Sequence, residues 1–244
     1  IRTPMNAIIG MTAIAAAHLS DSKKVEECLM KIASSSRYLL GLINDILDLS
    51  RIERGKMSIR QEVFDFQEMI KSLAAISSAQ AQERRQDFGI RVSGDFDQIY
   101  AGDELRLKQI LLNVLSNAHK YTPDGGWVLM EVFSNPAANG ITMMKFAVSD
   151  NGAGIEPEYL EKIFEPFCQG SNASGSTGSG LGLAITQNLV HLMNGSITVS
   201  STYGKGSCFT VELPLKRVEG AGFPAKNTQV VGDRDLRILL VDDD

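Results

Sequence analysis

An apolar stripe over residues 25–50 constrains the fold of this 244-residue chain more than any other feature. Its positions lie alternately four and three residues apart, the spacing of the seam in a coiled coil or helical bundle. A shorter helix should precede it, after Pro4, with a break and N-cap at Ser20-Asp21-Ser22. Two helices with one stripe each cannot enclose a core, so we expect a hairpin that joins a second hairpin in a dimeric four-helix bundle. The alternative is that the stripe packs on the rest of the same chain. The stripe consists of Val25, Leu29, Ile32, Ser36, Leu39, Ile43, Ile46 and Ser50.

The residue pattern changes after Gly55, where the second helix should end. Short runs of strand-forming residues then alternate with helical runs, which predicts helices covering one face of a mixed sheet. The fold class is therefore α+β, a helical hairpin followed by an α/β sandwich. The expected strands are 58–64, 127–133, 141–148, 196–200 and 208–213, and the expected helices are 66–85, 104–120, 156–163 and 181–193.

Four segments follow from this pattern: the hairpin (1–57), the α/β domain (58–216), a linker (217–235) and the start of a further domain (236–244). The linker is polar and rich in Gly and Pro, which is typical of a connecting segment. Residues 236–244 form an apolar run that ends in three aspartates. We interpret this run as the start of a buried strand; the alternative is an acidic tail.

The composition argues against several functional classes. The net charge is −5 and the pI about 5.3, so nothing indicates a nucleic-acid surface. No apolar run approaches the roughly 20 residues that span a bilayer, and no secretory signal opens the chain. We expect a soluble, cytoplasmic piece, and an inner-membrane parent would need segments upstream of Ile1. The three widely spaced cysteines argue against a disulfide framework or a zinc site; they are Cys28, Cys168 and Cys208.

Three motifs carry candidate chemistry, and the first is a helix with two asparagines. Asn113 and Asn117 are four residues apart, so both lie on one helical face, and Lys120 flanks that face. Amide oxygens suit Mg²⁺, and an ammonium group suits phosphate. By itself the pattern is weak, because asparagines on a helix are usually only solvated.

The second motif, Asp150-Asn-Gly-Ala-Gly-Ile155, directly follows an apolar strand. A carboxylate at a strand end can accept a hydrogen bond from an amine such as adenine N6, and the glycines allow backbone to approach a flat ring. The simpler interpretation is a tight turn.

The third motif, Gly178-Ser-Gly-Leu-Gly-Leu183, opens a helix whose N-terminal amides could bind anions. It is neither a Walker loop nor a dinucleotide fingerprint, because no Gly-Lys-Ser/Thr and no early βαβ unit accompany it.

Taken together, these motifs resemble the histidine kinases. Five segments occur in the order of the N, G1, F, G2 and G3 boxes of that family, and Ile1-Arg-Thr-Pro-Met-Asn6 resembles the end of the H box. The resemblance covers residues 1 to about 215. The five segments are Asn113–Tyr121, Asp150–Ile155, Ile163–Phe167, Gly178–Ile185 and Gly204–Phe209.

The resemblance implies a Bergerat ATP-binding fold that takes ATP and Mg²⁺. Asp150 would hold the adenine amine, Asn117 would ligate Mg²⁺, and Lys120 would face the phosphates. Thr3 would match the threonine that follows the phospho-acceptor histidine by four, and Phe164 and Phe167 would pack under an ATP lid. The catalytic residues implied in this way are Thr3, Asn113 and Lys120. The implied cofactor-binding residues are Asn113, Asn117, Lys120, Tyr121, Asp150, Gly152, Gly154, Ile155, Phe164, Phe167, Gly178, Ser179, Gly180, Leu181 and Gly182.

The sequence departs from the family pattern in two places. The acceptor histidine should lie two residues before Ile1, and we expect none of the three histidines present to replace it; they are His18, His119 and His191. The lid between Phe167 and Gly178 contains no Lys or Arg, so it lacks the cation that many relatives place near the γ-phosphate.

Asn113 separates two activities of the same fold. In ATP hydrolases such as gyrase and MutL, a glutamate four residues before the metal-binding asparagine activates water; here that position is Asn113, and a neutral amide cannot act as a general base. We therefore expect an ATP-dependent protein-histidine kinase that autophosphorylates a hairpin histidine. The alternatives are a non-catalytic dimeric scaffold and a serine kinase of this fold.

The expected partners follow from the same resemblance. The chain should form a homodimer through the hairpin and pass its phosphoryl group to a receiver aspartate. Residues 239–243 resemble the first receiver strand, whose acidic pair binds Mg²⁺, so the parent is expected to be a hybrid kinase with a receiver in cis; a separate response regulator is the other acceptor.

Overall fold

The computed structural model describes residues 2–94, 99–168, 179–218 and 238–240. The chain divides into two compact units, Ile1–Met57 and Ser58–Asp244. The lid, the linker from 219 onward and the acidic end of segment 236–244 were singled out in the sequence, and they lie outside the described residues.

The first unit is a hairpin of two helices, α1 (Arg2–Ala17) and α2 (Ser22–Glu53). The expected N-cap is present, because the Asp21 carboxylate accepts a hydrogen bond from the backbone N–H of Lys24 at 3.1 Å. The chain leaves α2 through Gly55, whose φ of +63° favours glycine. Among the described residues, no helix is long and apolar enough to cross a membrane.

The apolar surface of α2 is wider than the single seam expected from the sequence. Val25, Ile32 and Leu39 are half-buried, whereas Leu29 and Ile43 of the same stripe are exposed. Other large apolar side chains of the hairpin are also exposed: Met5, Ile9, Ile14, Leu19, Met30, Leu40, Ile46 and Leu47. The two helices therefore leave many of their large apolar side chains uncovered.

The second unit is built on a mixed sheet in the order β1-β3-β7-β5-β4-β2-β8, with β6 beside β7. β2 runs parallel to β4 and to β8, and the other pairs are antiparallel. The mixed sheet expected from the sequence is thus present. The strands are β1 (Glu62–Asp65), β2 (Asp87–Ser93), β3 (Ile99–Gly102), β4 (Trp127–Pro136), β5 (Ile141–Asp150), β6 (Ser196–Thr202), β7 (Gly206–Val218) and β8 (Ile238–Leu240).

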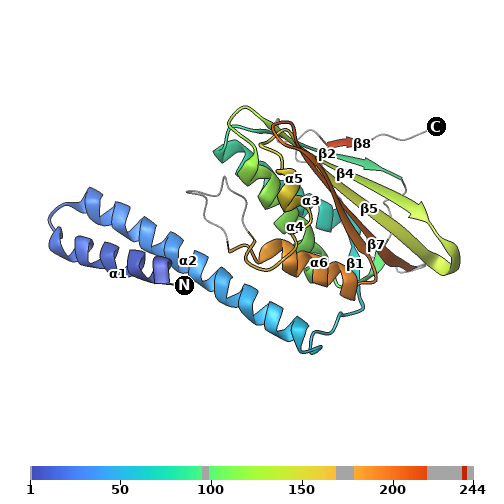
Figure 1. The fold of residues 1–244 in the computed structure, drawn as a ribbon, viewed down its shortest axis with the longest axis horizontal. Helices are drawn as coiled ribbons and strands as arrows, with labels where there is room; N and C mark the ends of the chain where they lie inside the picture. Colours follow the sequence, from blue (N-terminus) through green and yellow to red (C-terminus); the bar gives the residue numbers. More distant parts are fainter. Residues whose placement is uncertain (1, 95–98, 169–178, 219–237, 241–244) are drawn as a thin grey trace, which may run out of the picture. The chain divides into compact units, whose positions relative to one another are not determined.

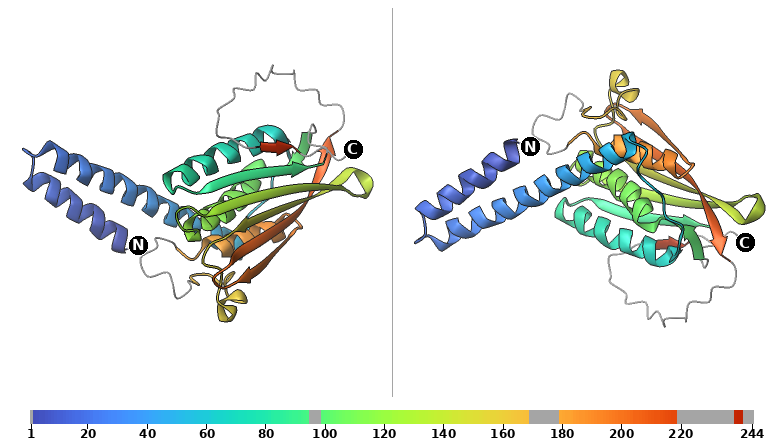
Figure 2. Two further views of the ribbon diagram at one scale, coloured as in Figure 1. Left: turned by 90° about the horizontal axis from the view of Figure 1, so that it is seen from above. Right: turned by 90° about the horizontal axis from the view of Figure 1, so that it is seen from below.

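Three helices, α3 (Phe66–Glu83), α4 (Glu104–Tyr121) and α6 (Gly182–Leu192), cover one face of this sheet (Figures 1 and 2). Two short helices lie in the connections, η1 (Ala138–Gly140) and α5 (Pro157–Leu160). The core between helices and sheet contains the fully buried Phe66, whose ring lies 5.6 Å from that of Tyr100 and 6.2 Å from that of Phe146. Burial of these rings, together with the aliphatic side chains of the core, holds the helical layer to the sheet.

Two strands were missed by the sequence analysis, and some predicted elements had wrong boundaries. β2 and β3 were not expected, and β1 begins at Glu62 rather than at residue 58. Residues 58–61 do not pair with a strand, because the chain there instead approaches the N-terminus of α4. The helix expected over 156–163 is regular only over Pro157–Leu160.

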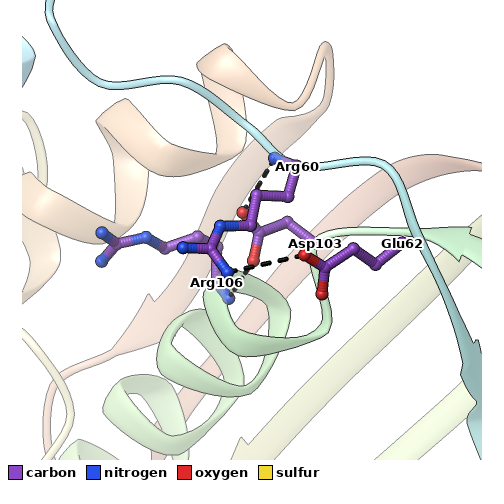
Figure 3. A network of polar contacts seen from close by, with 4 residues as sticks. All are labelled: Arg60, Glu62, Asp103 and Arg106. Atoms are coloured by element: carbon purple, nitrogen blue, oxygen red, sulfur yellow. Dashed lines mark hydrogen bonds and ion pairs between the residues drawn. The ribbon is translucent and has the colours of Figure 1, made fainter.

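Asp103 fixes the N-terminus of α4 (Figure 3). Its Oδ1 accepts a hydrogen bond from the backbone N–H of Arg106 at 3.1 Å, and its Oδ2 accepts one from the backbone N–H of Arg60 at 3.0 Å. The Arg60 guanidinium also lies 3.5 Å from Glu62. One buried carboxylate therefore caps α4 and holds the segment that leads into β1.

We expect Asp103→Ala to lower the free energy of unfolding by about 2–3 kcal/mol, because it removes the cap and leaves the Arg60 N–H without its acceptor. Asp65→Ala is the matched control, since Asp65 caps α3 through Glu68 but is exposed, and it should cost only about 1 kcal/mol. Urea unfolding of both variants measures the difference. Equal losses would show that the second bond of Asp103 adds nothing.

Candidate functional site

The three polar residues of the first motif lie along α4 as expected, half-buried at positions 113, 117 and 120. The Asn113 amide donates a hydrogen bond to Thr186 Oγ1 on α6 at 2.7 Å. A Cβ on Gly182 would collide with the Asn113 side chain, so glycine there lets the start of α6 approach α4. Within the described part of the chain, the Asn117 amide has no hydrogen-bond partner, which leaves its oxygen available to a ligand.

Asp150 lies at the end of β5, paired with Val128 of β4 on one side and Ser207 of β7 on the other. Its side chain is buried, and its Oδ1 accepts a hydrogen bond from the backbone N–H of Gly152 at 2.8 Å. Burial raises the pKa of the Asp150 carboxyl above its ordinary value, while backbone N–H groups of Gly152 and Ser207 act in the opposite direction. A buried carboxyl held by two backbone donors still has acceptor capacity for a third.

Three glycines around Asp150 stand where no side chain fits. A Cβ on Gly152 would meet the Tyr121 carbonyl group, and one on Gly154 would meet the backbone of Thr202 and the residue after it. Gly206 has a φ of +109°, and its Cβ would meet the backbone carbonyl of Asp150. Backbone therefore packs on backbone around the turn that begins at Asp150, and only glycine allows this close approach.

The turn that begins at Asp150 is held by groups distant in sequence. Ala153 donates its backbone N–H to the Tyr121 carbonyl at 3.1 Å. Ile155 donates its backbone N–H to Ser201 Oγ at 2.9 Å, and that hydroxyl also lies 3.0 Å from Ser207 Oγ. The sequence did not single out Ser201, because its link to Ile155 spans 46 residues and leaves no local pattern.

The third motif is described from Ser179 onward, so Gly178 lies outside the described residues. Gly180 has a φ of +69°, and its carbonyl accepts a hydrogen bond from the Phe167 N–H at 2.9 Å. Leu181 is buried and donates its N–H to Ser179 Oγ at 3.2 Å. The F and G2 segments are thus in direct contact through backbone.

The aromatic residues of the F segment differ in burial. Phe167 is 67% exposed and has a φ of +65°, a conformation that a bulky residue rarely adopts, whereas Phe164 is half-buried. Residues 169–178 of the lid lie outside the described residues, so the packing of both phenylalanines under it stays a prediction. Thr3, the remaining candidate, is an exposed residue of α1 in the other unit.

Lys120 and Tyr121 contact each other at the end of α4. The Lys120 ammonium donates a hydrogen bond to the Tyr121 hydroxyl at 3.2 Å and lies 4.8 Å from the centre of its ring. Tyr121 is partly exposed beside the Asp150 turn. A lysine in this position lies close to the site with its charge unpaired by any carboxylate among the described residues.

Two family models match the chain. The model of the His Kinase A (phospho-acceptor) domain matches residues 1–55, and that of the histidine kinase-, DNA gyrase B- and HSP90-like ATPase matches residues 102–217. The chain belongs to the histidine kinases. The family that the sequence motifs indicated is thereby confirmed.

The relatives of this histidine kinase chain are longer proteins. It is 35% identical over 249 residues to the autoinducer 2 sensor kinase/phosphatase LuxQ of Vibrio vulnificus, and 36% identical over 231 residues to the sensory/regulatory protein RpfC of Xanthomonas campestris. These matches cover 100% and 94% of this chain but only 29% and 31% of the two relatives. The chain thus spans less than a third of their length.

Solved structures confirm the fold class of this histidine kinase chain. Full-length ShkA in complex with AMPPNP has a TM-score of 0.67 and 29% identity, covering 89% of this chain and 44% of that one. The histidine kinase AdeS of Acinetobacter baumannii has a TM-score of 0.62 at 21% identity, covering 87% of this chain and 95% of that one, a likeness that shows the fold alone.

His119, inside the first motif of this histidine kinase, is a buried residue and not an exposed acceptor candidate. Its Nδ1 lies 2.9 Å from Gln86 Oε1, and among the described residues its Nε2 has no partner. Burial, and then the nearby Arg84 charge, lowers the pKa of His119 to about 4.

We expect His119 to make folding pH-dependent. The unfolded chain protonates this imidazole near its ordinary pKa of 6.5 and the folded chain only near 4, so its contribution is present above pH 6.5 and is lost as the pH falls toward 4. The loss should reach about 3 kcal/mol. Urea unfolding of the chain and of His119→Met between pH 7 and 4 measures it, since carboxylates such as Asp150 are common to both. Parallel pH profiles would contradict the assignment.

Proposed function

We propose that this chain is the catalytic part of a hybrid histidine kinase. It uses ATP to phosphorylate a histidine of the helical hairpin and then passes the phosphoryl group to an aspartate of a receiver domain. The observation that carries the proposal is the buried Asp150 carboxylate at a strand end. It begins a glycine-containing turn that the Ala153 N–H joins to the Tyr121 carbonyl, at the end of the helix that carries Asn113, Asn117 and Lys120.

Asp150 is suited to hold the adenine base. Its acceptor capacity matches the donor N–H of an exocyclic amine, and its burial makes that bond strong and selective. Gly152, Gly154 and Ile155 form the backbone beside which a flat ring would lie, and Tyr121 is proposed to contact its open edge.

The phosphates and Mg²⁺ are assigned to α4 and the start of α6. The Asn117 amide oxygen is a hard ligand without a protein partner among the described residues, which fits Mg²⁺. Bound there, the ion would offset charge on the β- and γ-phosphates. Lys120 would add a positive charge, and the backbone of the Gly178–Gly182 segment would supply N–H donors.

The site is arranged for transfer to a protein rather than to water. The Asn113 amide is already bonded to Thr186 and packed on Gly182, and an amide cannot take a proton from water. An imidazole nitrogen needs no such base, because its lone pair attacks the γ-phosphorus while the bond to the ADP oxygen breaks. Positioning and charge neutralisation then supply most of the catalysis.

The hairpin is proposed to form a homodimer and to carry the acceptor histidine two residues before Ile1. The uncovered apolar side chains of α1 and α2 support pairing with a second copy. Thr3 would lie one helical turn after that histidine and would take part in removing the phosphoryl group from the receiver. We place the catalytic part in the cytoplasm, attached to the inner membrane only if the parent has upstream spans, with residues 236–244 opening the receiver.

The direct test is labelling with γ-labelled ATP and Mg²⁺. The chain as given should bind nucleotide without labelling itself, whereas a longer protein that includes the upstream residues should acquire an acid-labile, base-stable label typical of phosphohistidine. In the longer protein, Asn117→Ala should reduce labelling by at least about 100-fold, because the metal would lose its ligand.

Asn188→Ala is the matched control and should label normally, since the side chain of this α6 asparagine bonds, within the described part of the chain, only to the Ala184 carbonyl. Label on His18, His119 or His191 of the short chain would show that the acceptor is misplaced. Label on serine would identify a protein-serine kinase instead.

A further inference from the structure

Gln86, between α3 and β2, makes an unusual set of buried contacts. Its Nε2 donates hydrogen bonds to two backbone carbonyls at the end of α4, that of His119 at 2.9 Å and that of Thr122 at 2.6 Å. Its Oε1 lies 2.9 Å from His119 Nδ1. The last carbonyls of a helix lack partners within the helix, so Gln86 caps the end of α4 from outside, and Arg84 Nη1 adds a longer contact to the His119 carbonyl at 3.5 Å.

These bonds determine the orientation of the Gln86 amide and the protonated nitrogen of His119. Because the Gln86 NH₂ group donates to two carbonyls, its oxygen must accept, and His119 Nδ1 must carry the proton. His119 Nε2 then holds a lone pair in a site with no donor among the described residues, 5.4 Å between ring centres from Phe88. The neutral imidazole and the amide form one unit that cannot rotate without breaking bonds.

The end of α4 that Gln86 holds is also the support of the nucleotide site. The Tyr121 carbonyl, between the two carbonyls bound by Gln86, accepts the Ala153 N–H at 3.1 Å and lies against Gly152. The turn beside Gln86 adds to this, since the Arg85 carbonyl accepts the N–H of Gly125 in the loop after α4 at 2.8 Å. A shift of this helix end would therefore move the turn that begins at Asp150.

We propose that Gln86 is a positioning residue for nucleotide binding: its side chain holds the end of α4 so that the Tyr121 carbonyl can fix the Asp150–Gly154 turn. The inference rests on the proposed nucleotide site. The inference goes beyond the proposed function because it assigns a role to a residue outside every motif of the site. Gln86 would act through α4 and not by contact with the nucleotide.

Gln86→Met tests the proposal, because methionine has a similar length and no hydrogen bonds. In the 244-residue chain at 10 °C, with the folded state verified by circular dichroism, its affinity for Mg-ADP by calorimetry should fall at least about fivefold. Amide hydrogen exchange at Ala153 should become faster in the free protein, since its acceptor is no longer held. A role in stability alone would lower the unfolding temperature and leave both readouts unchanged.

Two variants separate this effect from general damage. Met144→Ala opens a cavity in the core near the start of β5, at the opposite end of this strand from Asp150. It should destabilise the chain but leave the affinity for Mg-ADP and the hydrogen exchange at Ala153 unchanged. Gln86→Met with His119→Leu removes the stranded imidazole, while the Thr122 carbonyl stays without its Gln86 donor and the His119 carbonyl keeps only the 3.5 Å contact to Arg84 Nη1, so binding should stay weak. Recovery of binding in that double variant would overturn the proposal.

The outcomes also separate this inference from the proposed function. Unchanged ADP affinity and unchanged exchange in Gln86→Met, with normal binding by the unsubstituted chain, would overturn the role of Gln86 alone. Failure of the unsubstituted chain to bind ADP at millimolar concentration would overturn the proposed function and this inference with it.

Discussion

The site depends on one buried carboxylate at the end of a central strand. Asp150 is fixed by pairing of β5 with β4 and β7, and backbone of Gly152 and Gly206 packs so closely around it that no Cβ fits. A carboxyl in such a place is costly unless it is hydrogen-bonded, and two backbone donors meet that need in part. The remaining acceptor capacity is what the proposed function assigns to an adenine amine.

The second constraint is the placement of α4, which presents Asn113, Asn117 and Lys120. Both of its ends are tied to other segments: its N-cap Asp103 also accepts the N–H of Arg60, and the Gln86 side chain donates to carbonyls at its C-terminus. The helix is thus positioned along its axis as well as by its apolar face. This explains why the polar face of α4 keeps a fixed position relative to the turn that begins at Asp150.

The features that the sequence predicted are those set by local spacing. Asparagines four apart share a helical face, and an apolar run followed by Asp150 places a carboxylate at a strand end. β2 escaped prediction because its charged and glycine-containing sequence becomes a strand through parallel pairing with β4. The contacts of Ser201 and Gln86 escaped for a related reason, since each joins residues more than 30 positions apart. The apolar stripe indicated a hairpin. Which residues of the stripe stay exposed depends on how α1 packs against α2, and the spacing within one helix does not determine that.

The central claim is that Asp150 recognises the amine of adenine, and comparing ATP with inosine triphosphate tests it most directly. The two nucleotides differ at the base, where inosine has an oxygen acceptor in place of the amine, so a buried carboxylate should reject it. Calorimetry on the chain with Mg²⁺ should show inosine triphosphate binding at least about tenfold more weakly than ATP, and Asp150→Asn should narrow that gap because an amide can donate to the oxygen. Equal affinity of the unsubstituted chain for the two nucleotides would contradict the account.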